Sequence, residues 1–369
     1  MSPQPPQPDL LYSEEEEALR SALRDLLADH CGAAAVLART ESDAPHDRAL
    51  WTSLAEGMGL AGLLVPESLG GQGASHREAA VVLEELGRAV APVPYLTSAV
   101  VATEALLACA GDEATGLLAE LATGRTVAVL VHGPASGPAG APGAVRQEGG
   151  LLYGETGVVA DAAAADVLLV PTRDGALYAV DAADATVTPR VSLDLTRPLA
   201  AVVLDGTPGR LLGQDAGAAV TRALRAGAGL LASEQLGVAD WCLTETVRHL
   251  KERTQFNRPV GGFQALKHRL AQLWLETVGV RAAARNAADA LATNSPDTDV
   301  AVAVAAAYAS PVAVHAAEEA VQLHGGIGMT WEHPVHLYLK RAKADAIAYG
   351  SAGRHRAALA ELVDLRPPL

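Results

Sequence analysis

Aromatic residues and cysteine are both scarce in this chain. Only two Phe, four Trp and seven Tyr occur among 369 residues, although half of the residues are apolar. Alanine, leucine and valine therefore supply most of the core, which favours closely packed helices over an aromatic-rich β-sandwich. The three cysteines, Cys31, Cys109 and Cys242, are far apart and lack the paired spacing of metal or redox motifs. We predict that they are small buried residues in a reduced compartment, and that the chain has no metal site.

The chain also has too little positive charge for a nucleic-acid-binding protein. Its formal net charge is -15 at pH 7, whereas binding to a phosphate backbone requires a basic face. No apolar run is long and uninterrupted enough to predict a membrane span. The proline-rich lead Met1–Pro8 has neither the basic region nor the apolar core of a signal peptide. We therefore expect a soluble, cytoplasmic protein without nucleic-acid partners.

The first third of the chain has the periodicity of helices. Ser13 and Glu16 form the pattern of a capping box, which predicts a helix that begins directly after Ser13. Three further helices are predicted at 49–58, 77–90 and 96–110. We assign residues 1–124 to an N-terminal α-helical domain.

The pattern of apolar residues changes from helical to strand-like at Thr126. Short β-branched or apolar runs, separated by Gly, Pro and Asp, predict a small β domain over residues 125–212. The predicted strands are 126–131, 151–154, 166–171, 176–181 and 200–204. Helical periodicity returns near Asp215 and predicts long helices at 215–253, 263–293, 300–323 and 334–364. The fold class is therefore α+β, with residues 213–369 forming a C-terminal four-helix bundle.

Two C-terminal segments carry the most specific pattern. The first, Arg253–Pro259, offers a cation, an amide and an aromatic ring at the end of a helix, and it is followed by Phe263 and Gln264. The second, Gln322–Pro334, offers an amide and a glycine-rich break between two helices. A guanidinium for phosphate, a ring for a planar base and glycines for close backbone approach suit a large nucleotide cofactor.

In order and spacing, these segments resemble the acyl-CoA dehydrogenase family of flavoproteins. That family has an Arg-x-x-Phe-Gly-x-Pro stretch with a following Phe-Gln, and later Gln-(x)2-Gly-Gly-x-Gly. The N-terminal segments 13–32, 60–73 and 84–88 also resemble the family, whereas the match in the middle of the chain is weak. The resemblance implies an FAD-dependent enzyme that desaturates an acyl-CoA thioester between its α- and β-carbons.

The resemblance also assigns cofactor-binding residues. They are Arg253, Gln255, Phe256, Phe263, Gln264, Gln322, Leu323, Gly325 and Gly326. The family uses these positions to hold the pyrophosphate and adenine half of FAD across a subunit interface. We expect the guanidinium at 253 and the break at 322–326 to converge on the diphosphate from different protomers.

The family's catalytic base is missing at both of its usual positions. Those positions correspond here to Tyr349 and Gly227, and a phenol with a pKa near ~10 is a poor base at neutral pH. Glu234, two helical turns from Gly227, is a weak candidate for a displaced base, with an ion-pair or capping role as the alternative. The family's flavin-ring loop also has no clear counterpart in Val131–Gly140, where Ser136 is the one candidate substitute.

These losses concern what one subunit supplies to its own active site, whereas the retained residues act across an interface. The leading hypothesis is therefore a base-lacking subunit of a heteromeric acyl-CoA dehydrogenase that completes the FAD site of a homologous subunit. Two alternatives stay open: a self-sufficient homo-oligomer with an unusual base, acting on a thioester or activating oxygen, and a non-catalytic assembly partner. The sequence identifies neither the acyl group nor the electron acceptor.

Several other residues receive ordinary structural interpretations. His324, Trp331 and His333 are expected to pack or to hydrogen-bond locally. Glu245 fits an exposed helix position, and Arg341 is interpreted as a surface charge.

Overall fold

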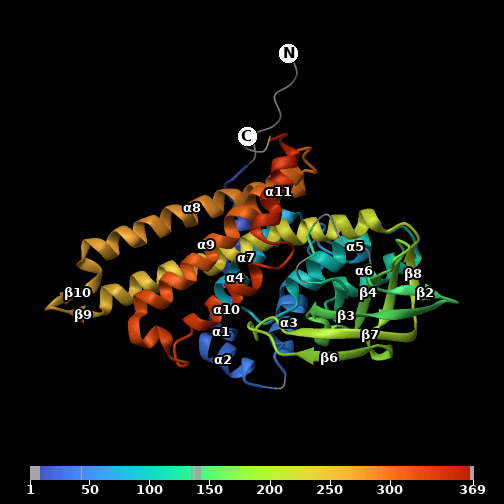
Figure 1. Cartoon of the computed structure of the whole chain (residues 1–369), viewed down its shortest axis with the longest axis horizontal. Coiled ribbons are helices and arrows are strands. Elements are labelled where there is room, and N and C mark those ends of the chain that lie inside the picture. The colour runs from blue at the N-terminus through green and yellow to red at the C-terminus, as the bar shows by residue number, and fades with distance from the viewer. Residues whose placement is uncertain (1–8, 43, 134–135, 138–142, 366–369) are drawn as a thin grey trace, which may run out of the picture.

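The computed structural model describes residues 9–42, 44–133, 136–137 and 143–365. Helices occupy both ends of the described chain, and two sheets lie between them in sequence. Figure 1 shows the sheets at one end of the molecule and the long C-terminal helices extending to the other. The N-terminal helical elements are α1 (Glu14–His30), α2 (Ala33–Thr40), α3 (Arg48–Thr52), η1 (Ser53–Gly57), η2 (Leu60–Gly62), η3 (Glu67–Leu69), α4 (His76–Ala89), η4 (Tyr95–Ala102), α5 (Thr103–Leu107) and α6 (Asp112–Ala122).

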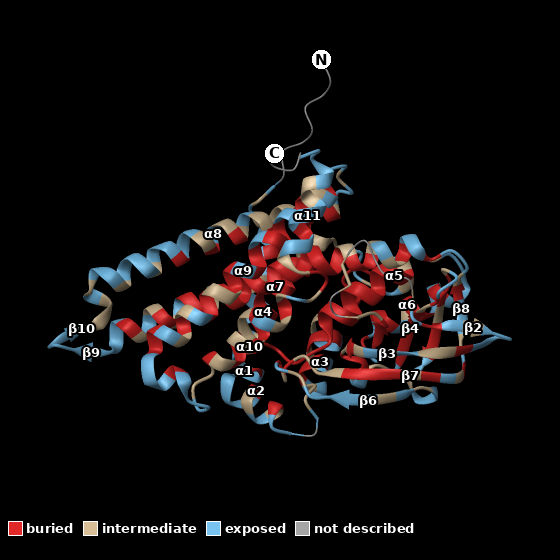
Figure 2. Cartoon of the chain, in the orientation of Figure 1, coloured by how far each residue is buried: buried red, intermediate tan, exposed pale blue. Residues whose placement is uncertain are grey.

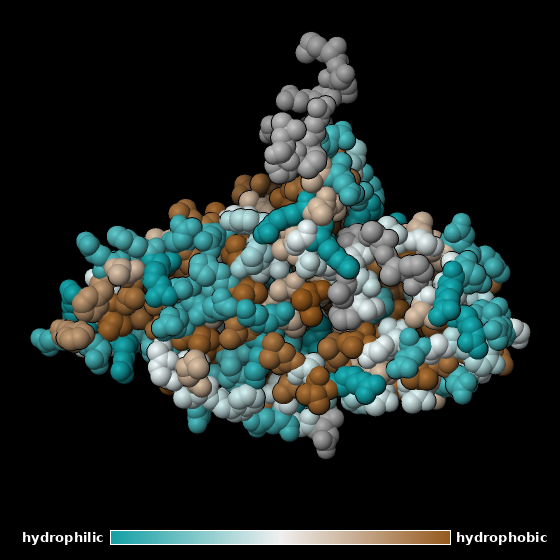
Figure 3. All heavy atoms as spheres, viewed as in Figure 1, coloured by the Kyte–Doolittle hydropathy of each residue, from teal (hydrophilic) through white to brown (hydrophobic). Residues whose placement is uncertain are grey.

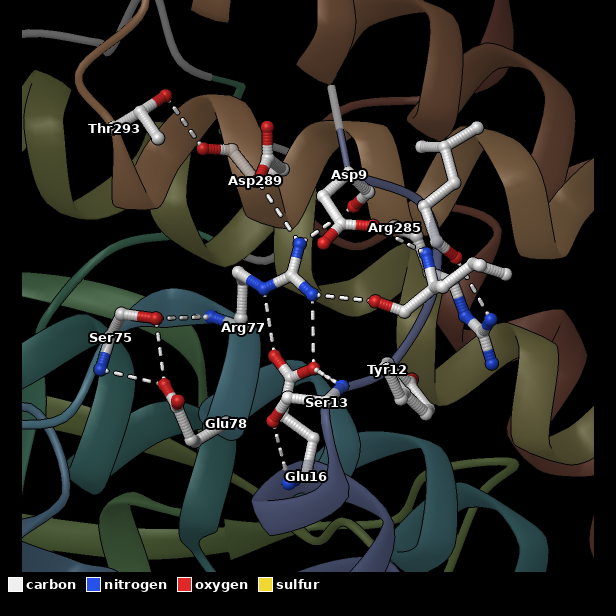
Figure 4. Close-up of polar contacts among 12 residues, drawn as sticks. Asp9, Tyr12, Ser13, Glu16, Ser75, Arg77, Glu78, Arg285, Asp289 and Thr293 are labelled. Carbon is white, nitrogen blue, oxygen red and sulfur yellow. Dashed lines mark hydrogen bonds and ion pairs between the residues drawn. The ribbon is translucent and has the colours of Figure 1, made fainter. Parts of the chain in front are cut away.

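Helix α1 begins where the sequence predicts. The Ser13 hydroxyl accepts a hydrogen bond from the backbone N–H of Glu16 (3.1 Å), and the Glu16 carboxylate accepts one from the backbone N–H of Ser13 (2.6 Å). This reciprocal pair confirms the predicted capping box. Figure 4 shows that Arg77, on α4, binds the Glu16 carboxylate and also Asp289 on the C-terminal helix α8. One guanidinium therefore joins the two helical parts of the chain.

The middle of the chain forms two four-stranded sheets. One has the order β1-β4-β5-β8 and the other β2-β3-β7-β6; β1 pairs with β4 in parallel, and the other neighbouring strands are antiparallel. The strands are β1 (Ala128–Leu130), β2 (Arg146–Glu148), β3 (Leu151–Ala160), β4 (Val167–Pro171), β5 (Leu177–Asp181), β6 (Thr186–Arg190), β7 (Leu199–Pro208) and β8 (Arg210–Gly213).

All five strands predicted from the sequence are present, and three more strands of these two sheets were missed. The missed strands β2, β6 and β8 lie at sheet edges. Strand β6 is mostly exposed, whereas β4 is buried over most of its length (Figure 2). Because an exposed edge strand buries little surface, it carries little of the apolar signal by which strands are recognised.

The C-terminal helices pack on one another and on α4. They are α7 (Gly217–Glu252), α8 (Gln264–Ala292), α9 (Thr298–His324), α10 (Val335–Asp345) and α11 (Ala352–Leu362). Helices α4 and α7 approach so closely that a Cβ at Gly237 would lie 1.9 Å from the carbonyl oxygen of Glu84. Glycine is therefore required at this crossing. Between α7 and α8 the chain forms a short hairpin of β9 (Thr254–Gln255) and β10 (Arg258–Pro259), which projects from the end remote from the sheets (Figure 1).

The predicted last helix, 334–364, is wrong as a single element. The chain breaks between α10 and α11, where Tyr349 and Gly350 have φ angles of 53° and 103°. A helix cannot continue through left-handed residues, and the Ser351 hydroxyl caps the new helix α11. The break matters because it turns Tyr349 inward.

Helix α9 limits the prediction that no apolar run of the chain is long enough for a membrane span. The stretch Thr298–Met329 is long and apolar enough to cross a membrane by length and composition alone, so the sequence prediction was too strong. However, 67% of its apolar window is buried inside the protein, as in the core helix of a globular domain. On the face shown in Figure 3, hydrophobic and hydrophilic residues are interspersed.

Candidate functional site

A surface cleft lies where the end of α7 meets the glycine-rich end of α9. It has a volume of about 510 Å³. Five of the predicted cofactor-binding residues line it: Arg253, Gln322, Leu323, Gly325 and Gly326. The two sequence segments that suggested a nucleotide cofactor, about 70 positions apart, therefore meet in one cleft of a single chain.

This arrangement corrects one expectation. We expected Arg253 and the break at 322–326 to reach the diphosphate from different protomers, but both line the same cleft of one protomer. The parallel packing of α7 and α9 is the reason, since it places the C-terminal ends of both helices side by side: the ring centroids of His249 on α7 and His324 on α9 are 4.4 Å apart.

The cleft presents an uncompensated positive charge. Arg253 is exposed at the C-terminus of α7, and among the described residues no carboxylate pairs with its guanidinium. The neighbouring Arg269, by contrast, forms a bidentate ion pair with Glu319 (2.6 and 2.7 Å). A free guanidinium is the donor geometry that phosphate groups require.

The glycines of the cleft leave the backbone accessible. Gly325 has a φ of 64°, in the left-handed region that favours glycine, and a Cβ at Gly326 would meet nothing within 4 Å. Gly328 differs, because a Cβ there would lie 2.5 Å from the carbonyl oxygen of Val321. Gly328 is therefore needed for packing, whereas Gly325 and Gly326 leave space in which a ligand can approach the backbone. Together with Arg253, this fits the diphosphate of a nucleotide cofactor.

The remaining predicted cofactor residues lie outside the cleft. Gln255 and Phe256 are on the projecting hairpin, where the Phe256 side chain is 85% exposed. Its ring meets Phe263 edge-on at 6.1 Å, and the Arg258 guanidinium stacks on Phe263 at 3.9 Å. Gln264 is exposed at the first position of α8. Their assignment as cofactor ligands stays a prediction that requires a second subunit.

Gly227 and Tyr349, the residues that the sequence predicts to correspond to the family's two base positions, lie against each other. A Cβ at Gly227 would lie 2.8 Å from Cε1 of Tyr349 and 2.9 Å from a methyl group of Val101. The Tyr349 side chain is 4% exposed, and its ring lies 5.3 Å from that of His132. Burial raises the pKa of Tyr349 above its ordinary value. A buried phenol whose pKa is raised is a still weaker base than an exposed one.

The middle-domain loop packs behind this tyrosine. Ser136 donates its backbone N–H to the carbonyl of Gly133 (2.9 Å), and Gly137 approaches the carbonyl oxygen of Tyr349. Residues 134–135 and 138–140 of the predicted loop lie outside the described residues. Whether Ser136 replaces the family's flavin-ring loop stays a prediction.

Glu234 is held in a buried ion-pair network. Arg197 donates to both of its carboxylate oxygens (2.7 and 2.6 Å), and Arg341 donates to one (2.7 Å). Burial alone would raise the pKa of Glu234, but the charges of Arg197 and Arg341 lower it overall. A carboxylate held between two guanidinium groups is a poor proton acceptor, so the contacts favour the ion-pair role over the displaced base.

Arg341 is not the surface charge that the sequence suggested. It is 2% exposed and pairs with Asp194 (2.6 Å) as well as with Glu234. Asp345 joins the network through Arg197 (2.7 Å), while its second carboxylate oxygen is buried without a hydrogen-bond partner among the described residues. Burial, and then the charge of Glu234, raise the pKa of Asp345 to about 8.

A cluster of histidines beside the cleft was missed by sequence reasoning. The ring centroids of His249 and His324 are 4.4 Å apart, as are those of His324 and His333. Glu245 lies with them. Burial and then the charge of His324 lower the pKa of both His249 and His333. The sequence contains no local pattern for this cluster, because its four residues, three histidines and Glu245, come from α7, the end of α9 and the segment before α10.

A cleft with a free guanidinium and open glycine backbone, at the ends of long packed helices, suits a large nucleotide cofactor. Comparisons with known proteins identify the family. Residues 13–125 match the acyl-CoA dehydrogenase N-terminal domain, and residues 216–363 match the acyl-CoA dehydrogenase C-terminal domain. The chain therefore belongs to the acyl-CoA dehydrogenase family, which confirms the resemblance, the fold class and FAD as the family's cofactor.

Individual relatives agree with this assignment. The chain is 39% identical over 333 residues to acyl-CoA dehydrogenase IpdE2 of Mycobacterium tuberculosis, covering 90% of this chain and 92% of the relative. It superposes on a chain of a Tcur3481-Tcur3483 steroid ACAD variant with a TM-score of 0.84 at 30% identity, covering 95% and 98% of the two chains. It superposes on a chain of the ChsE4-ChsE5 complex from M. tuberculosis with a TM-score of 0.87 at 28% identity, covering 98% and 100%.

Proposed function

We propose that this chain is the base-lacking subunit of a heteromeric acyl-CoA dehydrogenase, and that it completes the FAD site of a homologous subunit. The observation that carries the proposal is the contact between Tyr349 and Gly227. Neither residue at the predicted base positions has a carboxylate. The buried ring of Tyr349 packs against the backbone of Gly227. FAD, when bound in such an enzyme, accepts the hydride from the β-carbon of the acyl group; removal of the α-proton needs a separate base.

Two nearby acidic residues, Glu234 and Asp345, do not supply that base. Glu234 is engaged by Arg197 and Arg341. Asp345, with a pKa of about 8, is protonated at neutral pH and cannot accept a second proton. A carboxylate from a partner subunit is therefore the simplest source of a base for the reaction.

The cleft supports the second part of the proposal, that this chain completes the FAD site of a homologous subunit. Arg253 and the backbone at Gly325 and Gly326 face a space open to solvent, which suits binding of a diphosphate that a partner also contacts. The hairpin of β9 and β10 projects beyond the helices (Figure 1), and the Phe256 side chain on it is exposed. We assign this exposed ring to the interface with the homologous subunit.

Two solved relatives support a heteromeric arrangement. One is described as the ChsE4-ChsE5 complex and the other as a Tcur3481-Tcur3483 steroid ACAD. We extend to this chain both the pairing of two different subunits and a steroid-derived acyl-CoA as the first substrate class to assay. A role in lipid metabolism and a cytoplasmic location belong to the same proposal; the free cysteines Cys31, Cys109 and Cys242 are compatible with a reducing compartment.

Purification with and without a partner tests the proposal. The chain is expressed alone, and then together with a family member that carries the catalytic Glu, and flavin absorbance per chain and reduction by acyl-CoA are measured. We expect flavin and activity only in the mixed assembly. A yellow homo-oligomer that is reduced by substrate would instead establish the self-sufficient enzyme, and a mixed assembly in which loss of Arg253 changes no flavin property would favour the assembly partner.

A further inference from the structure

Three potential metal ligands from three segments of the chain meet beside the cofactor cleft. Glu245 lies on α7, His324 is the last residue of α9, and His333 precedes α10. One ligand atom from each lies within 4.8 Å of the others. The residues between His324 and His333 include the glycines that line the cleft.

The side chain of His324 points to a ligand most directly. Its Nδ1 donates to the carbonyl oxygen of Ala320 (2.7 Å), so that in the neutral ring Nε2 carries a lone pair. His324 is only 5% exposed, and Nε2 is buried without a hydrogen-bond partner among the described residues. An unsatisfied buried acceptor costs free energy. The Nδ1–H bond to a backbone carbonyl is also the arrangement that orients a metal-binding histidine.

The other two ligands can complete a site. His333 is half-buried, and its Nδ1 accepts only a long contact of 3.3 Å from the N–H of Val335. A ring nitrogen of His333 becomes the ligand atom when metal binding replaces this long contact. Glu245 adds a negative charge, and both of its carboxylate oxygens accept from the Arg248 guanidinium (2.9 Å from Nε to Oε2). Tetrahedral coordination at 2.0–2.1 Å requires ligand atoms about 3.3 Å apart, which small side-chain rotations of these two partly exposed residues can achieve.

We propose that Glu245, His324 and His333 bind a divalent transition-metal ion, with zinc as the preferred metal. Two imidazoles and one carboxylate match the nitrogen and oxygen ligands that zinc accepts, and water fills the fourth position. The ion joins both ends of the segment 325–332 to α7. It thereby fixes the backbone of Gly325 and Gly326 at the edge of the cofactor cleft, so that metal binding stabilises the conformation in which those glycines face the ligand.

Zinc binding is measured on the full-length, tag-free chain after treatment with EDTA, without flavin and without a partner subunit. Equilibrium dialysis against zinc chloride, followed by elemental analysis, gives the stoichiometry; titration against a chromogenic chelator gives the affinity. We expect one zinc ion per chain and a higher melting temperature in its presence. Because neither flavin nor partner is present, the result is independent of the proposed heteromeric function.

The variants Glu245→Gln and His333→Ala should each weaken zinc binding by about tenfold or more. His268→Ala, which removes an exposed histidine of α8 outside the cluster, is the matched control and should bind zinc as the wild type does. Circular dichroism checks that each variant is folded; if His333→Ala is not, Glu245→Gln decides. Wild-type protein that retains no more zinc than the folded ligand variant would overturn the proposal.

Discussion

The ring of Tyr349 packs directly on the backbone of Gly227, so that even a methyl group at position 227 would lie within 2.8 Å of a ring carbon. The two residues come from opposite ends of the C-terminal helical region, and they are the positions that the sequence predicts to correspond to the family's two alternative base sites. Neither residue is a carboxylic acid. A tyrosine ring at one position leaves no room for a side chain at the other.

Gly227→Ala should therefore destabilise the protein. Overpacking against Tyr349 and Val101 is expected to cost about 1–3 kcal/mol of unfolding free energy. Gly116→Ala is the control, because Gly116 lies in the interior of α6, where a methyl group would meet nothing within 4 Å; it should stabilise by about 0.5–1 kcal/mol. Urea denaturation gives the change in unfolding free energy for each variant. Equal changes would show that helix propensity, and not the contact with Tyr349, determines the effect of alanine at position 227.

Tyr349→Phe should leave turnover of the active assembly within about twofold of the wild type. The buried phenol has a raised pKa and cannot act as the base at neutral pH. General-base catalysis contributes roughly 10²–10⁴-fold to a rate, so steady-state kinetics will separate the two cases clearly. A hundredfold fall in kcat, with flavin content retained, would assign the acid–base role to Tyr349.

Arg253→Ala should weaken FAD binding in the assembled enzyme. Loss of a charge-assisted hydrogen bond to phosphate costs about 1.5–3 kcal/mol, which corresponds to roughly 10- to 150-fold in affinity. Lys251→Ala removes another exposed cation, two residues earlier on the same helix and not among the residues lining the cleft. Flavin content after gel filtration and FAD titration of the apo-assembly should change in the first variant alone. Unchanged affinity would remove Arg253 from the cofactor site.

Asp345→Asn should alter how stability depends on pH. The native pKa of Asp345 is about 8, whereas an unfolded aspartate has a pKa of about 4. The native state therefore holds a proton that the unfolded state releases, and wild-type stability declines as pH rises from about 4 to 8. Asparagine keeps an oxygen acceptor for Arg197 without titrating. The stability of the Asp345→Asn variant relative to the wild type should increase between about pH 4 and 8 and level off above about pH 8. Melting temperatures at pH 5–9 measure this difference. A difference that does not depend on pH would refute the assigned pKa.

Glu234→Gln should behave in the opposite way. The pKa of Glu234 is lowered in the native state, so its contribution to stability is present above the unfolded pKa and is lost as pH falls. At neutral pH, removal of its charge leaves Arg197 and Arg341 undercompensated in the interior, with an expected cost of about 3–5 kcal/mol. Asp299→Asn, which breaks an exposed pair with Arg225, should cost less than about 1 kcal/mol. Denaturation at pH 7 compares the two, and similar costs would contradict the buried network.

The sequence by itself determined the family, the α-then-β-then-α order of the chain and the capping box at Ser13. These follow from local periodicity and from motifs that are contiguous in the chain. That residues 227 and 349 occupy the family's base positions stays a prediction. The domain limits 124/125 and 212/213, and the cofactor roles of Gln255, Phe256, Phe263 and Gln264, stay predictions.

Only the tertiary structure decided that Arg253 shares a cleft with Gly325, that Tyr349 turns inward to meet Gly227, and that Arg341 is buried beside Glu234. It alone brought Glu245, His324 and His333 together. The physical reason is common to all of these cases. A residue's charge, pKa and accessibility depend on neighbours contributed by other helices, and helix packing places those neighbours without leaving a local pattern in the sequence.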